Sequence, residues 1–144
     1  MILRGFWDEG LYLNQRVLDE ESQIEKRLLG TTYNNIGGSY DNKGEWDKAL
    51  AYYLKSEKIR IEVCDRAGLA YTYFNIGAVY LEKNDTKNGE DSIILGVYIA
   101  VTQGMKHELS QMEWALGPII ERIGQEAFIE KGRSLCKAKG LSSL

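Results

Sequence analysis

The chain has 144 residues, of which 44% are hydrophobic and 27% charged, and its net charge is −3 at pH 7. These are values of an ordinary globular protein. No apolar run approaches the roughly 18 residues of a membrane span, and the start of the chain lacks the features of a signal peptide. The basic residues are scattered, without the positive patch that nucleic-acid binding requires. We therefore expect a cytoplasmic protein with no nucleic-acid or membrane partner.

Residues with catalytic or metal-binding chemistry are few. The chain has two cysteines, Cys64 and Cys136, and a single histidine, His107. These are too few for a disulfide framework or a metal-ligand cluster. No nucleophile is accompanied by a recognisable activating base. The sequence therefore predicts no metal, no cofactor and no enzymatic activity.

A six-residue segment recurs along the chain. Asn35-Ile36-Gly37-Gly38-Ser39-Tyr40 returns as Asn75-Ile76-Gly77-Ala78-Val79-Tyr80, and its glycine recurs again as Gly117. A second set of positions, also 40 residues apart, holds residue types that tolerate the left-handed backbone that ends a helix: Gly44, Asn84 and Gly124. A repeat of this length is typical of stacked helical units. We expect Gly37, Gly77 and Gly117 to allow close helix packing.

Apolar periodicity predicts helices throughout the chain. In chain order they cover residues 6–27, 31–42, 46–63, 68–82, 87–103, 107–123 and 125–138. Gly5–Leu11 aligns with Gly44–Leu50, so residues 1–29 are expected to form a partial repeat that starts in its second helix. The complete units 30–67 and 68–106 follow, and a degenerate capping unit, 107–140, closes a single domain. Pro118 is expected to kink or break the sixth helix.

The first complete unit resembles the tetratricopeptide repeat, because it reads Tyr33-x-x-Ile36-Gly37-x-x-Tyr40 and then Ala49-x-x-x-Tyr53. The second unit keeps the first half of this pattern. The period of about 40 residues, against the usual 34, and the Asn before the apolar-Gly pair resemble the extended subtype found in scaffold and signalling proteins. The resemblance implies an all-α fold, a right-handed α-solenoid of antiparallel helical hairpins with about seven helices.

The first helix of each unit is expected to line the concave side with the face that points away from its glycine. The predicted peptide-binding residues on this face are Asn34, Asn35, Asn42, Tyr71, Asn75 and Trp114. A carboxamide can bind both the N–H and the C=O of a peptide, and the resemblance implies this role for the Asn at positions 35 and 75. The alternative is that each Asn satisfies a neighbouring helix end or buried carbonyl, and that the aromatic side chains belong to the core.

The leading hypothesis is a non-enzymatic scaffold that binds a peptide or protein segment in its concave groove. One alternative is a regulatory, sensor or oligomerisation segment of a larger signalling protein, an ATPase or a kinase. The start in mid-repeat favours it, and so does Leu116–Gly124, which resembles the closing segment of repeat arrays in such proteins. Another alternative is a homo-oligomer that forms through the N-terminal partial repeat.

Overall fold

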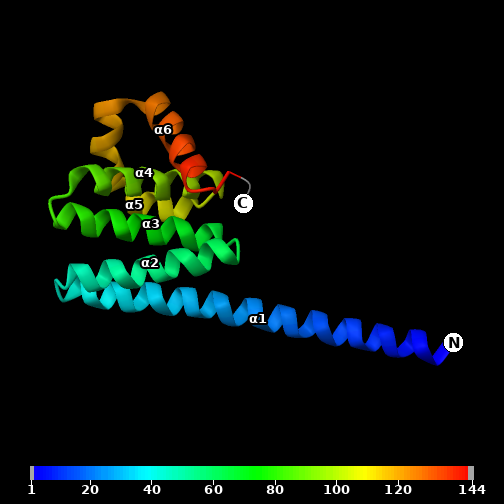
Figure 1. Ribbon diagram of the computed structural model, residues 1–144. Helices are drawn as coiled ribbons and strands as arrows, with labels where there is room; N and C mark the ends of the chain where they lie inside the picture. Colours follow the sequence, from blue (N-terminus) through cyan, green and yellow to red (C-terminus); the bar gives the residue numbers. More distant parts are fainter. Residues whose placement is uncertain (1, 143–144) are drawn as a thin grey trace.

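The computed structural model describes residues 2–142, with the side chains of residues 9 and 12–142. This part of the chain contains helices and no strand, which confirms the all-α prediction (Figure 1). The helices are α1 (Ile2–Asn42), α2 (Trp46–Glu62), α3 (Arg66–Glu82), α4 (Thr86–Thr102), α5 (Lys106–Ile123) and α6 (Gln125–Ala138). Within residues 2–142, none of them combines the length and the apolar character needed to cross a bilayer.

The helices stack as antiparallel hairpins around one apolar core. The C-terminal half of α1 pairs with α2, α3 pairs with α4, and α2 packs against α3 (Figure 1). The two ends of the stack differ, because α5 and α6 both pack on α4 and make few contacts with each other. The largest fully buried side chains are Tyr53, Tyr73, Leu69, Ile93 and Ile94. The core is therefore centred on α3 and α4, which are covered on both sides.

A left-handed residue ends one helix after another at intervals of 20 positions. The backbone φ is positive at Gly44, Cys64, Asn84, Gly104 and Gly124. In the turn at Cys64, the N–H of Asp65 donates to the carbonyl of Arg60 at 2.8 Å, the bond that caps a helix ending in this conformation. The left-handed conformation predicted for Gly44, Asn84 and Gly124 is confirmed, and two further turns share it.

The N-terminal region departs from the expected seven helices, because the predicted helices 6–27 and 31–42 are one continuous helix. The residue 20 positions before Gly44 is Ile24, and a β-branched side chain is strongly disfavoured at positive φ. Gly30 stays helical and buried, and a Cβ there would lie 3.3 Å from Cγ of Arg60. The chain therefore has no residue suited to a turn here, and α1 extends past the end of α2 (Figure 1).

Two of the three repeated glycines allow close helix packing, as predicted. A Cβ on Gly37 would lie 2.7 Å from the ring of Tyr53, and a Cβ on Gly77 would lie 2.8 Å from the carbonyl oxygen of Gly89. The prediction was wrong for Gly117, where a Cβ would meet no atom within 4 Å. The third occurrence of the motif therefore keeps the residue without the close contact that requires it.

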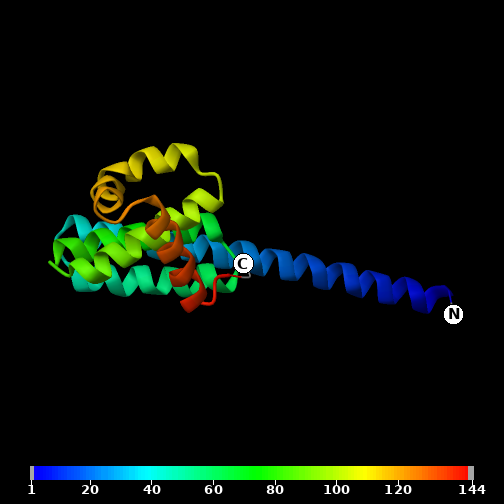
Figure 2. The same cartoon turned by 90° about the horizontal axis from the view of Figure 1, so that it is seen from above.

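Pro118 lies inside α5, which runs from Lys106 to Ile123 without interruption. The helix nevertheless changes direction in its second half, where its gold segment leaves the line of the yellow segment (Figure 2). Proline has no N–H to donate and its ring crowds the preceding turn, so a bend at this position is the expected response. The prediction of a kink is confirmed and that of a break is not.

Candidate functional site

An open groove of about 410 Å³ follows the C-terminal half of α1. Residues of α1 form most of its lining, with one residue each from α2 and α3. The lining consists of Asn34, Asn35, Gly38, Ser39, Asp41, Asn42, Tyr53 and Asn75. The structure thus places four of the six predicted site residues, the four asparagines, in one groove. Polar side chains dominate this surface.

The groove exists because the two first helices of the hairpins lie close together. Residues 34, 38, 41 and 42 of α1 are three or four positions apart and therefore share one helix face. Asn75 of α3 reaches the same space because α3 also contacts α1. Gly37, one residue before Gly38, lies on the ring of Tyr53, which brings that side chain to the floor of the groove. The close glycine contact thus places α2 beneath the groove.

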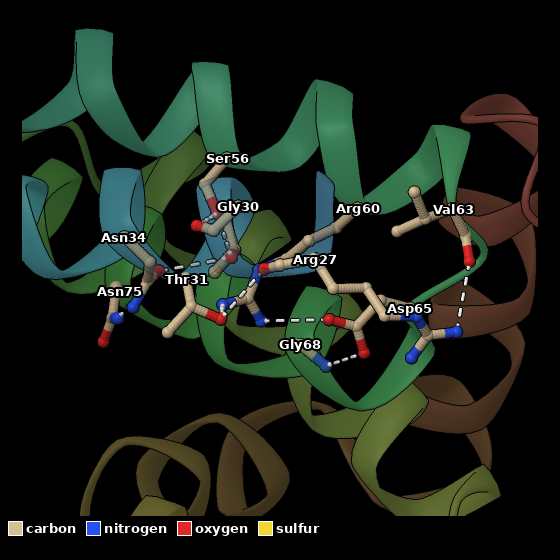
Figure 3. Close-up of polar contacts among 11 residues, drawn as sticks. Arg27, Gly30, Thr31, Asn34, Ser56, Arg60, Val63, Asp65, Gly68 and Asn75 are labelled. Carbon is tan, nitrogen blue, oxygen red and sulfur yellow. Dashed lines mark hydrogen bonds and ion pairs between the residues drawn. The ribbon is translucent and has the colours of Figure 1, made fainter. Parts of the chain in front are cut away.

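Asn34 and Asn75 are held by hydrogen bonds within the protein. The side-chain oxygen of Asn34 accepts from the Thr72 hydroxyl at 3.2 Å and from the amide nitrogen of Asn75 at 3.5 Å (Figure 3). These bonds use one end of each carboxamide. The NH2 group of Asn34 and the side-chain oxygen of Asn75 make no side-chain hydrogen bond to another described residue, so both groups remain for a ligand.

Asn35 and Asn42 have a different environment, because both are exposed. Neither side chain makes a hydrogen bond to another residue in the described part of the chain. Their carboxamides keep both donors and both acceptor positions. Asn34 and Asn75 are therefore fixed in orientation, whereas Asn35 and Asn42 can adjust to a bound group.

A buried polar chain continues from Asn34 into the protein (Figure 3). The hydroxyl of Thr72 lies 3.4 Å from that of Ser56, which donates to the carbonyl of Gly30 at 2.7 Å. Ser56 and Thr72 are both fully buried. A buried hydroxyl without a partner is costly. These hydrogen bonds therefore fix α1, α2 and α3 relative to one another, and with them the end of the groove at Asn34.

Arg60 is a buried cation with a separate set of polar partners. Its side chain pairs with Asp65 at 3.7 Å and donates to the Thr31 hydroxyl at 3.5 Å (Figure 3). Burial lowers the pKa of Arg60, and the Asp65 carboxylate opposes that shift. Gly68 makes the room, because a Cβ there would lie 1.8 Å from a guanidinium nitrogen. Sequence reasoning missed Arg60, although its spacing of four and seven from Ser56 and Tyr53 places it on the buried face of α2.

Two carboxylates meet beside the groove. Burial, together with the neighbouring Glu82 of α3, raises the pKa of Asp41 to about 6. Burial and these same two carboxylates raise the pKa of Tyr53 to about 12, so its hydroxyl is neutral at physiological pH. The groove therefore has one acidic end, formed by Asp41 with Glu82 next to it.

The other two predicted residues, Tyr71 and Trp114, do not line the groove. Trp114 is 63% exposed, and its ring packs edge-on against Phe74 with 5.9 Å between the centroids. Burial raises the pKa of Tyr71, and the neighbouring Glu108 carboxylate raises it further. Tyr71 lies one helical turn before Asn75 on α3, and Trp114 lies on α5, so both are outside the groove. The sequence predicted one binding strip for all six residues because it could not show where the groove ends.

Comparison with known proteins agrees with this architecture. Residues 28–88 match the family model described as the tetratricopeptide repeat, which covers the C-terminal part of α1, all of α2 and α3, and the start of α4. No curated protein and no solved structure matched the chain significantly. The matched residues include Gly37, Gly77 and all four asparagines of the groove. Residues 28–88 of this chain belong to the tetratricopeptide repeat family.

Proposed function

We propose that this protein is a non-enzymatic interaction scaffold that binds an extended peptide segment of a partner protein in the groove along α1. Tetratricopeptide repeats are in general protein-interaction scaffolds. The observation that supports this role is the gathering of Asn34, Asn35, Asn42 and Asn75 in one groove with unused hydrogen-bonding groups. Because every residue of a peptide offers an N–H and a C=O, carboxamides bind the backbone of many sequences.

A selection from a random peptide library displayed on phage tests this proposal. The wild-type chain is expected to enrich a family of related peptides. Asn35→Ala combined with Asn42→Ala should weaken the best peptide by about tenfold or more, since each lost hydrogen bond to an amide is worth roughly 0.5–1.5 kcal/mol. Both residues are exposed, so thermal unfolding should be unchanged.

Asn14→Ala is the matched control, because Asn14 is also exposed on α1 but lies outside the groove. It should leave the affinity unchanged. Failure of the wild-type chain to enrich any peptide family, or equal affinity of the double variant and the wild type, would contradict peptide binding in this groove.

Self-association through the first half of α1 is a second candidate function. Leu13, Val17, Ile24 and Leu28 are between 57% and 63% exposed. At 100° per residue they fall within an arc of about 60° on one helix face. Their spacings of four, seven and four residues are symmetric about the point between residues 20 and 21. Two antiparallel copies would therefore pair Leu13 with Leu28 and Val17 with Ile24 of the second copy.

The antiparallel pairing would cover four apolar side chains per copy, each contributing roughly 1.5–3 kcal/mol when fully buried.

Sedimentation equilibrium tests the dimer. The wild-type chain is expected to dimerise with rising concentration, and Val17→Glu with Ile24→Glu should give a monomer. Ile129→Glu is the control, because Ile129 is 46% exposed on α6, away from the stripe. A wild-type chain that stays monomeric at high concentration would contradict this second candidate.

A further inference from the structure

The acidic end of the groove has polar groups that the protein itself leaves without partners. One carboxylate oxygen of Asp41 is buried and has no hydrogen-bond partner. In the described part of the chain, no lysine, arginine or histidine pairs with Asp41 or with Glu82. No basic residue lines the groove either. Two neighbouring carboxylates without a cation repel each other, so this end of the groove is electrostatically incomplete.

Tyr53 adds a second, independent feature at the same place. Its side chain is only 2% exposed, yet it lines the groove. Within residues 2–142 its hydroxyl makes no hydrogen bond to another side chain or to the backbone. A buried phenol normally finds a partner. Its remaining accessible direction is the groove, where it can accept a hydrogen bond from a bound donor.

The groups that converge here are acceptors. The carboxylates of Asp41 and Glu82, the hydroxyl oxygen of Tyr53 and the side-chain oxygen of Asn75 all offer lone pairs toward or beside the groove. A guanidinium or an ammonium group carries only donors and a positive charge. It would supply hydrogen bonds to these acceptors and relieve the repulsion between the two carboxylates.

We propose that the Asp41 end of the groove binds the positively charged side chain, lysine or arginine, of the peptide segment. This inference rests on the proposed function and adds the chemical class of partner to it. The asparagines hold the backbone of the segment, which any sequence provides. The acidic end then selects segments with a basic residue at one position.

The same random peptide library tests the inference with a charge-neutral variant, Asp41→Asn with Glu82→Gln. Peptides enriched on the wild-type chain are expected to share lysine or arginine at one position, and the variant should lose that preference. Replacing this residue by glutamine in the best peptide should weaken wild-type binding about tenfold or more. In the variant the same replacement should change the affinity less than about threefold.

Glu113→Gln with Glu130→Gln is the matched control, because it removes the same two charges from exposed positions on α5 and α6. It should keep the preference for a basic residue. Enriched peptides without a shared basic residue, or a charge preference that survives in the Asp41 and Glu82 variant, would overturn the inference and leave the proposed function intact. No enrichment of any peptide on the wild-type chain would overturn both.

Discussion

Single residues decide where the helices of this chain end. At Gly44, Gly104 and Gly124 the left-handed backbone needs no compensation, because glycine adopts positive φ readily. Asn84 tolerates it. Cys64 has a φ of 55° and is neither of these residue types. Among these positions it is the residue with the least suitable side chain.

Cys64→Gly is therefore expected to stabilise the protein by about 1 kcal/mol, because a left-handed L-residue costs roughly 1–2 kcal/mol and glycine adds some unfolded-state entropy. Cys64 is exposed, so no packing is lost. Urea unfolding monitored by circular dichroism measures the change. Cys64→Ala should show no such gain, and a glycine variant no more stable than the wild type would contradict the strain argument.

Asp41 is expected to make stability depend on pH. Its pKa is about 6 in the folded protein, against an ordinary value of 3.8, so the folded state holds the proton of Asp41 more tightly between these two pH values. Protonated Asp41 therefore stabilises the folded state, and this contribution is complete below about pH 4 and is lost as the pH rises through 6. Asp41→Asn should equal the wild type in stability at pH 4 and exceed it at pH 7.

Urea unfolding of both proteins from pH 4 to pH 7.5 measures this difference. The groups facing Asp41 from the packed helices are Glu82 of α3 and Tyr53 of α2. Glu82→Gln should reduce the pH dependence, because it removes the neighbouring negative charge. A difference between wild type and Asp41→Asn that stays constant with pH would be inconsistent with the raised pKa.

Helix pairing depends on which glycines lie against a backbone. The α3–α4 hairpin is closely packed at Gly77, where a Cβ would lie 2.8 Å from the carbonyl oxygen of Gly89 and 2.9 Å from the nitrogen of Ile93. Backbone atoms cannot turn aside as a flexible side chain can. On α5, Gly117 has open space around it. A side chain at this repeat position would therefore clash in α3 but not in α5.

Gly77→Ala is expected to destabilise the protein by about 1–3 kcal/mol through overpacking. Gly117→Ala should instead stabilise it by about 0.5–1 kcal/mol, because alanine favours a helix interior. Thermal unfolding of the two variants beside the wild type checks the signs. Equal effects of the two substitutions would contradict the packing difference.

The sequence predicted the helices from residue 46 onward almost completely, because most of them begin or end next to a residue type that is typical of a turn, such as Gly44, Asn84 or Gly124. The long α1 was missed because similarity between Gly5–Leu11 and Gly44–Leu50 says nothing about the turn that must follow. Ile24 was the informative residue there. The four asparagines that line one groove were selected from their helix face, with the family resemblance added for Asn35 and Asn75, and their role in binding stays a prediction. Arg60 and Asp41 required knowledge of which helices meet.

The whole molecule is a stack in which each helix contacts mainly its neighbours. In such a one-dimensional arrangement the stability of a unit depends on its own interface. The end formed by α6 is attached mostly to α4. A Cβ on its Gly132 would lie 2.6 Å from the ring of Tyr98. Loss of this contact should affect the end of the stack first.

Gly132→Ala is accordingly expected to release α6 by local unfolding while α2, α3 and α4 remain folded. Hydrogen exchange read out by mass spectrometry should show faster exchange in residues 125–138, with little change in residues 66–102. Ser134→Ala, at an exposed position on the same helix, is the control. Uniformly faster exchange throughout the chain would show that the stack unfolds as one cooperative unit.

The unbroken α1 also joins two surfaces mechanically. It has 41 residues, roughly 60 Å at 1.5 Å per residue, and no turn along its length. The apolar stripe at Leu13–Leu28 and the groove wall at Asn34–Asn42 lie on the same rod. Because the buried contacts of Gly30 and Asn34 hold this rod against α2 and α3, a partner bound on the stripe would lie at a fixed distance and rotation from a peptide in the groove.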